Sequence, residues 1–237
     1  MSERFPEGSV ALVTGASRGL GAAVAVELAR LGAHVVLTAR TQGGLEETDD
    51  AIRAIGGAAT LLALDLREPT RIDAIGPTLY QRFGRLDALV HCSAVLGKLT
   101  PVAHIQPEDW NEVVAVNMTA AWRLIRTCDP LLRHGPAGRA VFATDSRAGM
   151  PEAYWGPYGA SKAAMAHLAL SWAAEVATTN LKVNLFDPGP MRTRLRSQAF
   201  PGAVPESFPP PEDAAPTLAA MVLASEVRNG AVVSMGA

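Results

Sequence analysis

A tyrosine and a lysine four residues apart are the side chains best suited to chemistry. Tyr158 and Lys162 stand in the sequence YGASK, within a stretch whose pattern predicts a helix. At this spacing both side chains share one helical face, one turn apart. The nearby ammonium group favours the phenolate, so we expect it to lower the pKa of Tyr158. Such a tyrosine can donate a proton to a carbonyl oxygen, or accept one from an alcohol, as hydride moves. By itself, the spacing also fits an exposed pair without function.

Ser146 is a further candidate, because it closely follows a predicted strand over residues 139–144. Ligands of open parallel sheets bind beyond the carboxyl ends of the strands. The Ser146 hydroxyl could therefore hold the same substrate oxygen as Tyr158. Its neighbours Asp145 and Arg147 form either a solvated ion pair or a polar part of the pocket mouth, and both interpretations remain open.

A glycine-rich turn follows the first predicted strand and opens a helix. It reads TGASRGLG over residues 14–21. Glycines let the backbone approach a pyrophosphate, and the unpaired N–H groups at a helix start attract its charge. Three residues separate the first two glycines, so the spacing differs from the usual G-x-G-x-x-G. The position between strand and helix is what predicts a dinucleotide site.

The end of the second predicted strand favours NADP over NAD. An NAD site places a carboxylate there to bind the ribose hydroxyls. Here the strand ends in Ala39 followed by Arg40, and the next carboxylate is Glu46. Arg40 and Arg18 could together bind a 2′-phosphate. The alternative is that Arg40 is a solvated charge at the end of the strand.

Short β-branched runs alternate with longer helical stretches, as in βαβ units. The predicted strands are residues 9–14, 34–39, 60–65, 86–91, 139–144, 181–187 and 231–235. The predicted helices are residues 19–31, 44–55, 69–83, 107–132, 157–178 and 214–225. This order predicts an α/β fold with one doubly wound, Rossmann-like, mostly parallel seven-stranded sheet and helices on both faces. The length of 237 residues suits a single domain over residues 1–237.

Six prolines between Pro201 and Pro216 interrupt the alternation. So many prolines argue against a helix or a central strand. We expect a proline-rich substrate lid at about residues 190–213, because long loops of this kind are often lids. An ordinary surface loop is the alternative.

These features together resemble the short-chain dehydrogenase/reductase family over nearly the whole chain. The glycine turn is similar to the family's cofactor fingerprint, and Tyr158, Lys162 and Ser146 are similar to its catalytic group. The resemblance implies that Tyr158 is the general acid/base and that Ser146 orients the carbonyl. It implies that Lys162 holds the nicotinamide ribose and tunes the tyrosine. It also implies that Asn117 marks a helix kink holding the water of a proton relay, whereas the residues alone favour a structural asparagine bonded to backbone.

The resemblance further implies a set of residues that bind NADP(H). Asp65, at the end of the third strand, would contact adenine, and Thr193, in the sequence DPGPMRT, would touch the cofactor near the nicotinamide. The predicted catalytic residues are Ser146, Tyr158, Lys162 and Asn117. The predicted cofactor-binding residues are Gly15, Ser17, Arg18, Gly19, Leu20, Gly21, Arg40, Asp65, Leu66, Ser93, Ala94, Tyr158, Lys162, Pro188, Gly189, Met191 and Thr193.

The sequence departs from the family pattern at residues 91–94 and at Asp145, where a serine usually precedes the catalytic serine. The usual Asn-Asn-Ala-Gly after the fourth strand is HCSA here, over residues 91–94. Loss of its glycine could narrow the backbone approach to the cofactor, and His91 is either a substitute hydrogen-bonding group or a structural residue. Ala174 precedes Glu175 where 3-oxoacyl-carrier-protein reductases often carry an arginine, so that activity is disfavoured.

Substrate recognition is assigned to two groups of residues. Met150, Tyr154 and Trp155 lie between Ser146 and Tyr158 and form either apolar substrate walls or loop packing. Three arginines stand at alternate positions at the start of the predicted lid: Arg192, Arg194 and Arg196. They could attract a carboxylate or phosphate of the substrate, or bind a cofactor phosphate, or form a solvated face.

Composition and charge restrict the partners. A net charge of −2 gives no basic footprint for nucleic acid, and no apolar run is long enough to span a membrane. The two cysteines, Cys92 and Cys128, show no metal-ligand or redox spacing. We therefore expect a cytoplasmic, NADPH-dependent oxidoreductase, without a metal, that acts on a small carbonyl or alcohol substrate. The resemblance implies a homo-tetramer or homo-dimer packed through residues 107–132 and 157–178.

Two other classes of function remain open. A catalytically idle NADP-binding redox sensor or regulatory protein is consistent with the altered sequence at residues 91–94. A nucleotide-binding methyltransferase would share the glycine turn but would have no use for Tyr158 and Lys162.

Overall fold

One parallel sheet organises the protein. The computed structural model describes residues 3–235, and within them seven strands pair in the order β3-β2-β1-β4-β5-β6-β7. The strands are β1 (Val10–Thr14), β2 (His34–Ala39), β3 (Ala59–Ala63), β4 (Ala88–His91), β5 (Arg139–Ala143), β6 (Lys182–Asp187) and β7 (Val232–Ser234). Every pairing is parallel. The strand order reverses between β1 and β4, and ligands of such sheets bind at this switch point.

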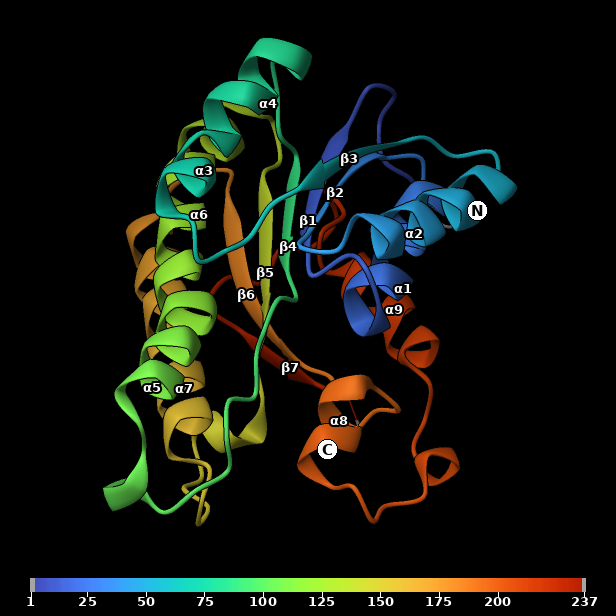
Figure 1. Ribbon diagram of the computed structural model, residues 1–237. Coiled ribbons are helices and arrows are strands. Elements are labelled where there is room, and N and C mark those ends of the chain that lie inside the picture. The colour runs from blue at the N-terminus through green and yellow to red at the C-terminus, as the bar shows by residue number, and fades with distance from the viewer. Residues whose placement is uncertain (1–2, 236–237) are drawn as a thin grey trace.

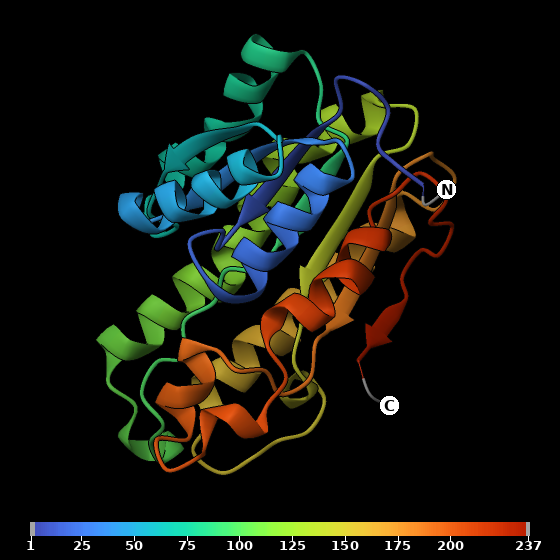
Figure 2. The same ribbon diagram turned by 90° about the vertical axis from the view of Figure 1, so that its right-hand side faces the viewer.

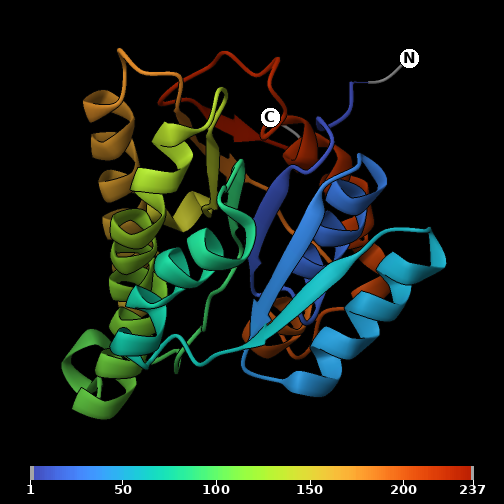
Figure 3. The same ribbon diagram turned by 90° about the horizontal axis from the view of Figure 1, so that it is seen from above.

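Helices cover both faces of the sheet (Figures 1 and 3). One face carries α1 (Gly19–Arg30), α2 (Gln42–Ala54) and α9 (Pro211–Ala220), with α1 between the other two (Figure 2). The other face carries α3 (Pro69–Asp73), α4 (Ile75–Phe83), α5 (Pro107–Val114), α6 (Ala120–His134) and α7 (Gly156–Glu175). Successive strand residues point to opposite faces. Leu12 of β1 accordingly joins the core under α6 and α7, while Val13 joins the core under α1 and α9. The predicted doubly wound fold is confirmed.

The predicted helix over residues 69–83 is two helices, α3 and α4, separated at Ala74. Contacts with α6 account for the break. The Thr127 hydroxyl donates to the Asp73 carbonyl (2.9 Å) and accepts from the Gly76 N–H (3.0 Å). A Cβ on Gly76 would lie 2.1 Å from the Thr127 carbonyl oxygen, so only glycine allows this approach.

The predicted helix over residues 107–132 continues through a π-helical turn, η2 (Ala115–Thr119), which joins α5 to α6. Single π-turns inside α-helices often occur at functional sites. Asn117 stands within this turn.

The proline-rich segment contains more helix than predicted. It holds α8 (Arg194–Ala199) and the 3₁₀ turn η4 (Pro205–Ser207), and α9 begins at Pro211 and not at residue 214. Pro211 occupies the first helical turn, where its missing N–H costs nothing. Pro216 lies inside α9 on an exposed face. Because proline has no N–H, the carbonyl of Glu212, four residues earlier, lacks its helical partner, and water can reach it there. The segment projects beyond the carboxyl ends of the strands (Figure 2).

None of the helices in the described residues combines the length and the hydropathy needed to cross a membrane.

Candidate active site

The glycine turn packs tightly between β1, α1 and the end of β4. Gly15 has φ +70°, and a Cβ there would lie 2.9 Å from the Ser93 backbone nitrogen. A Cβ on Gly21 would lie 2.3 Å from the Gly15 carbonyl oxygen. Both glycines are therefore required by close backbone approach. No side chain caps the start of α1, so its first N–H groups remain available to an anion.

A cleft of about 1670 Å³ opens at the carboxyl ends of the strands. Every predicted cofactor-binding residue lines it, from the glycine turn to Thr193. Of the predicted catalytic residues, Ser146, Tyr158 and Lys162 line the cleft, whereas Asn117 does not. The volume exceeds the roughly 300–1,000 Å³ of typical small-molecule sites. The cleft can therefore hold a large ligand together with a smaller one.

Arginines dominate the end of the cleft beside β2 and β3. Arg18 and Arg40 are exposed and line the cleft. The carboxylate at this end, Asp65, accepts hydrogen bonds from the Arg67 side chain at 2.6–3.1 Å. These bonds, together with the charge of Arg40, lower the pKa of Asp65. Because Arg67 neutralises Asp65, this end of the cleft is suited to bind an anionic group.

Lys162 is buried in the floor of the cleft. Its Nζ donates to the Ala143 carbonyl oxygen at the end of β5 (2.7 Å). Burial lowers the pKa of Lys162 to about 8, although the charge of Asp145 opposes the shift. The ammonium group therefore stays protonated at neutral pH, with two hydrogens left for another partner.

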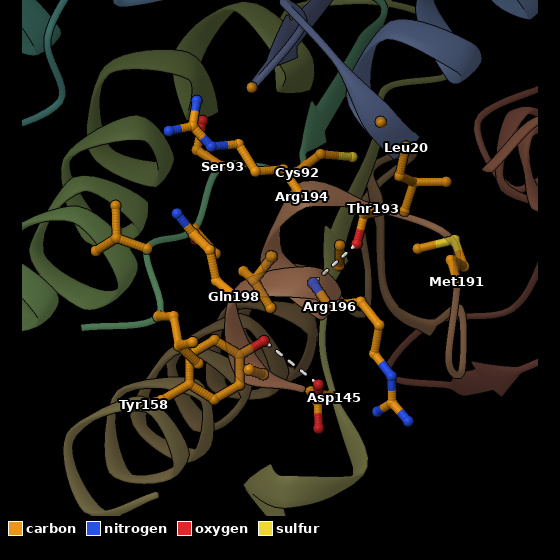
Figure 4. A pocket seen from close by; sticks show the side chains of 18 of the residues that line it. Leu20, Cys92, Ser93, Asp145, Tyr158, Met191, Thr193, Arg194, Arg196 and Gln198 are labelled. Atoms are coloured by element: carbon orange, nitrogen blue, oxygen red, sulfur yellow. Dashed lines mark hydrogen bonds between the residues drawn. The ribbon is translucent and has the colours of Figure 1, made fainter. Parts of the chain in front are cut away.

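The hydroxyl of Tyr158 is directed at a carboxylate. It donates to Asp145 Oδ2 over 3.3 Å (Figure 4). Burial and the charge of Asp145 raise the pKa of Tyr158 well above its ordinary value. The expected lowering by Lys162 is therefore wrong for this structure, in which Lys162 Nζ lies 6.0 Å from the tyrosine ring centroid. Tyr158 is held as a protonated hydroxyl.

Asp145, rather than Ser146, is the residue that faces the tyrosine hydroxyl. Ser146 begins the 3₁₀ turn η3 (Ser146–Ala148) and lines the cleft, but its hydroxyl makes no hydrogen bond with the described residues. Asp145 caps this turn by accepting from the Arg147 backbone N–H (2.9 Å). Sequence reasoning missed this placement, although the unusual carboxylate beside Ser146 was a visible signal. The orienting role of Ser146 stays a prediction.

Asp145 and Arg147 form a partly buried pair at the cleft. Arg147 Nη1 lies 3.4 Å from Asp145 Oδ1, and Arg147 Nε lies 2.9 Å from Glu152 Oε2. The guanidinium also stacks 3.7 Å above the Trp155 ring. Since Asp145 and Arg147 both line the cleft, the interpretation as part of the pocket mouth holds.

Asn117 is a satisfied, buried amide. Its Oδ1 accepts from the Val95 N–H (2.8 Å), and its Nδ2 donates to the Val95 carbonyl (2.9 Å) and to Ser161 Oγ (3.0 Å). These bonds match the structural alternative, because they fix the loop after β4 against α7. The relay role of Asn117 stays a prediction.

His91 is a structural residue. It is buried, and its Nδ1 lies 2.8 Å from the Thr14 hydroxyl. Burial, aided by Lys162, lowers the pKa of His91 to about 3, so the ring is neutral. Burial also raises the pKa of the Cys92 thiol to about 12, so the thiol stays protonated at neutral pH. Ser93 and Ala94 line the cleft, and their contact with the cofactor stays a prediction.

Only one of the three predicted substrate walls faces the cleft. Trp155 is buried there, and its ring packs edge-on against Tyr158 with centroids 5.6 Å apart. Met150 and Tyr154 are 64% and 56% exposed and do not line the cleft, so their assignment is wrong. Tyr154 has φ +74°, and this unusual backbone conformation belongs to the loop segment that leads outward before α7.

The three arginines at the start of the predicted lid all line the cleft but differ in burial. Arg192 and Arg194 are exposed. Arg196 is partly buried, and its guanidinium lies 3.9 Å from the ring centroid of Phe200 and 4.5 Å from that of Phe208. Arg196 therefore belongs to an aromatic cluster at the mouth, and a purely solvated role for it is excluded.

Comparison with known proteins identifies the family. A family model described as short chain dehydrogenase matches residues 9–203. The Escherichia coli K12 oxidoreductase YciK is 33% identical over 210 residues, which cover 87% of this chain and 83% of that protein. A structure assigned to the short chain dehydrogenases from Pseudomonas syringae is 34% identical, with TM-score 0.93 and coverage of 99% and 98% of the two chains. Another, from Escherichia coli CFT073 and complexed with NADPH, is 30% identical, with TM-score 0.92 and 99% coverage of both chains. The chain therefore belongs to the short chain dehydrogenase family.

Proposed function

We propose that the protein is an NADP(H)-dependent oxidoreductase that transfers a hydride between the cofactor and a carbonyl or alcohol group of a small molecule. Tyr158 would be the general acid/base. The observation that carries this proposal is the convergence of the glycine turn, Tyr158 and Lys162 on one cleft. Family membership supports the hydride chemistry, and the NADPH complex of the similar Escherichia coli CFT073 protein supports the cofactor.

The residues at the β2 end of the cleft fit the phosphates of NADP(H). The uncapped start of α1 supplies N–H groups and a positive partial charge for the pyrophosphate. Arg18 and Arg40 supply two guanidiniums for the 2′-phosphate. Asp65 would not repel that phosphate, because Arg67 already binds its carboxylate.

In this proposal the cofactor supplies the hydride, and side chains of this chain handle the proton. Tyr158 carries the proton for this step in the free protein, because burial and Asp145 hold its hydroxyl in the protonated form. Lys162 is fixed by its bond to the Ala143 carbonyl and could use its remaining hydrogens to bind the nicotinamide ribose. Ser146 lines the cleft and remains the candidate for orienting the substrate oxygen.

We also propose that the protein acts in the cytoplasm as a homo-dimer or homo-tetramer packed through α5, α6 and α7. Trp110 on α5 and Trp122 on α6 support this arrangement, because both remain more than two-fifths exposed. Exposed indoles are favoured at protein interfaces. Sedimentation equilibrium tests the assembly, and a single species of 24.9 kDa would exclude it.

Consumption of NADPH and of NADH against a panel of carbonyl compounds tests the proposed activity. We expect turnover with NADPH and little with NADH. Arg40→Ala should raise KM for NADPH by about 10- to 100-fold, since charged hydrogen bonds contribute about 1.5–3 kcal/mol. The matched control Arg53→Ala changes an arginine outside the cleft and should leave KM unchanged.

Tyr158→Phe tests the acid/base role. With a carbonyl substrate, we expect kcat to fall by about 10²- to 10⁴-fold while NADPH binding, followed by fluorescence, is preserved. Turnover that survives the substitution would contradict the assignment of Tyr158. Tight NADPH binding without turnover on any substrate would favour the idle redox sensor.

A further inference from the structure

A carboxylate stands where the substrate must meet the tyrosine. Asp145 Oδ2 accepts from the Tyr158 hydroxyl (3.3 Å), while Oδ1 accepts from the Arg147 backbone N–H (2.9 Å) and contacts Arg147 Nη1 (3.4 Å). The Asp145 side chain is 25% exposed and lines the cleft. One oxygen is thus committed to Arg147, and the other faces the tyrosine (Figure 4).

This arrangement disfavours a ketone. An atom that exchanges a proton with Tyr158 must come within hydrogen-bonding distance of its hydroxyl, and that hydroxyl itself lies 3.3 Å from Asp145 Oδ2. An ionised carboxylate only accepts hydrogen bonds. A ketone oxygen is also only an acceptor, and it gains negative charge as hydride adds to the carbon. The carboxylate would repel the negative charge that develops on this oxygen, and this repulsion slows the step.

A nitrogen that carries hydrogen is attracted to Asp145, whereas a ketone oxygen is repelled by it. In a protonated imine, the N–H can donate to Oδ2, and the positive charge is stabilised by the carboxylate. We propose that Asp145 binds the reacting atom of the substrate and selects a protonated carbon–nitrogen double bond over a ketone. This inference rests on the NADPH-dependent hydride transfer proposed above.

The reduction balances without a proton from the protein. The hydride brings two electrons and forms the new C–H bond, and NADPH is oxidised to NADP⁺. The π electrons of the C=N bond become the lone pair of the nitrogen, which loses its positive charge and keeps its hydrogen. Tyr158 can remain hydrogen-bonded to Asp145 during this step, so the contact seen in the structure need not break.

The cationic groups around Asp145 have other partners, so the negative charge of Asp145 is the one that acts most directly on the reacting atom. Arg147 is shared between Asp145 and Glu152. Arg196 stacks on Phe200 and lies beyond salt-bridge distance of Asp145. The Lys162 ammonium is directed at the Ala143 carbonyl. A substrate nitrogen beside Tyr158 would therefore have Asp145 as its direct charged partner.

Steady-state kinetics with matched probes test the inference. The probes are the cyclic imine 2-methyl-1-pyrroline and the ketone cyclopentanone, each with saturating NADPH. We expect kcat/KM of the wild type to favour the imine at least tenfold, and Asp145→Ser to shift the ratio toward the ketone by about 100-fold or more. A wild-type preference for the ketone that Asp145→Ser leaves unchanged would overturn the inference.

Glu152→Gln is the matched control. It removes the other carboxylate that contacts Arg147 but does not face Tyr158. We expect the imine-to-ketone ratio to stay within twofold of the wild type. If Glu152→Gln shifts the ratio as far as Asp145→Ser does, the selection comes from Arg147 and not from Asp145, and the inference fails.

A binding measurement separates this inference from the proposed function. With NADPH bound, the fluorescence of the cofactor reports the binding of two probes. Pyrrolidine is cationic, and cyclopentanol is neutral. We expect Asp145→Ser to weaken the binding of pyrrolidine at least tenfold and to leave the binding of cyclopentanol unchanged. Absence of pyrrolidine binding to the wild-type NADPH complex would overturn the inference alone. Absence of NADPH binding to both proteins would overturn the proposed function.

Discussion

Replacing Gly21 with alanine tests how the glycine turn is built. The added Cβ would lie 2.3 Å from the Gly15 carbonyl oxygen and 2.7 Å from its carbon, whereas ordinary contacts begin near 3.4 Å. Both neighbours are backbone atoms, so the first turn of α1 must move by about 1 Å. Overpacking of this kind costs about 1–3 kcal/mol, and the better helix propensity of alanine returns less than about 1 kcal/mol. We expect a net loss of about 1–2 kcal/mol in the free energy of unfolding.

The same displacement should weaken binding of the proposed cofactor, NADPH. Moving the N–H groups of the first turn by about 1 Å breaks one or two charge-assisted hydrogen bonds, each contributing about 1.5–3 kcal/mol. We therefore expect NADPH to bind Gly21→Ala at least tenfold more weakly in a fluorescence titration. Urea unfolding at 25 °C measures the stability change.

Gly43→Ala is the matched control for this prediction. Gly43 also lies near the start of a helix, α2, but a Cβ there meets nothing within 4 Å. This substitution should raise the free energy of unfolding by about 0.5 kcal/mol and leave NADPH binding unchanged. If Gly21→Ala proves as stable as the wild type and binds NADPH equally well, the packing argument for the turn is refuted.

Three further substitutions test the groups around the site. His91→Asn should remove a loss of stability on acidification: the folded protein keeps His91 neutral down to pH about 3, while the unfolded chain takes up a proton below about 6.5. The wild type should therefore lose roughly 2 kcal/mol more than the variant between pH 6.5 and pH 5, by urea unfolding. Asp145→Ser should move Tyr158 ionisation to lower pH, because the carboxylate helps to raise its pKa. Phenolate absorbance at 295 nm, corrected with Tyr158→Phe, measures this shift, and an unchanged midpoint would contradict it. Asn117→Ala should cost about 2–4 kcal/mol in urea unfolding, because the Val95 N–H and carbonyl both lose their partner. A cost below 1 kcal/mol would mean that the loop after β4 is held by other contacts.

The sheet was predictable because strand and helix patterns are local. Each strand of a parallel sheet is buried on both faces and reads as a short apolar run, as in Val10–Thr14. The interruptions of the helices were not predictable in this way. The end of α3 depends on Thr127, some fifty residues away, and the π-turn holds Asn117 against Val95, twenty-two residues away. Hydrogen bonds between distant segments leave no periodicity in the sequence.

The cleft residues were predictable for a topological reason. The carboxyl ends of parallel strands meet at one edge of the sheet, so residues that follow different strands converge there. The outward direction of Met150 and Tyr154 was not predictable, since it depends on the path of an irregular loop. The pairing of Tyr158 with Asp145 was missed for the same reason, because the direction of the 3₁₀ turn η3 decides which of two adjacent side chains faces α7.

The main charged neighbour of the Tyr158 hydroxyl is Asp145, whereas the sequence led us to expect Lys162. This difference changes how the site can handle a proton. Asp145 and Asp187 both raise the pKa of Tyr158, and both oppose the lowering of the Lys162 pKa by burial. The two carboxylates thus favour the protonated forms of the Tyr158 hydroxyl and of the Lys162 ammonium group. The raised pKa keeps the proton on Tyr158 in the free protein and also makes its hydroxyl a weaker acid, so the two carboxylates oppose transfer of that proton to a substrate oxygen. A substrate that is already protonated needs no proton from Tyr158, and this agrees with the proposed preference for a protonated imine.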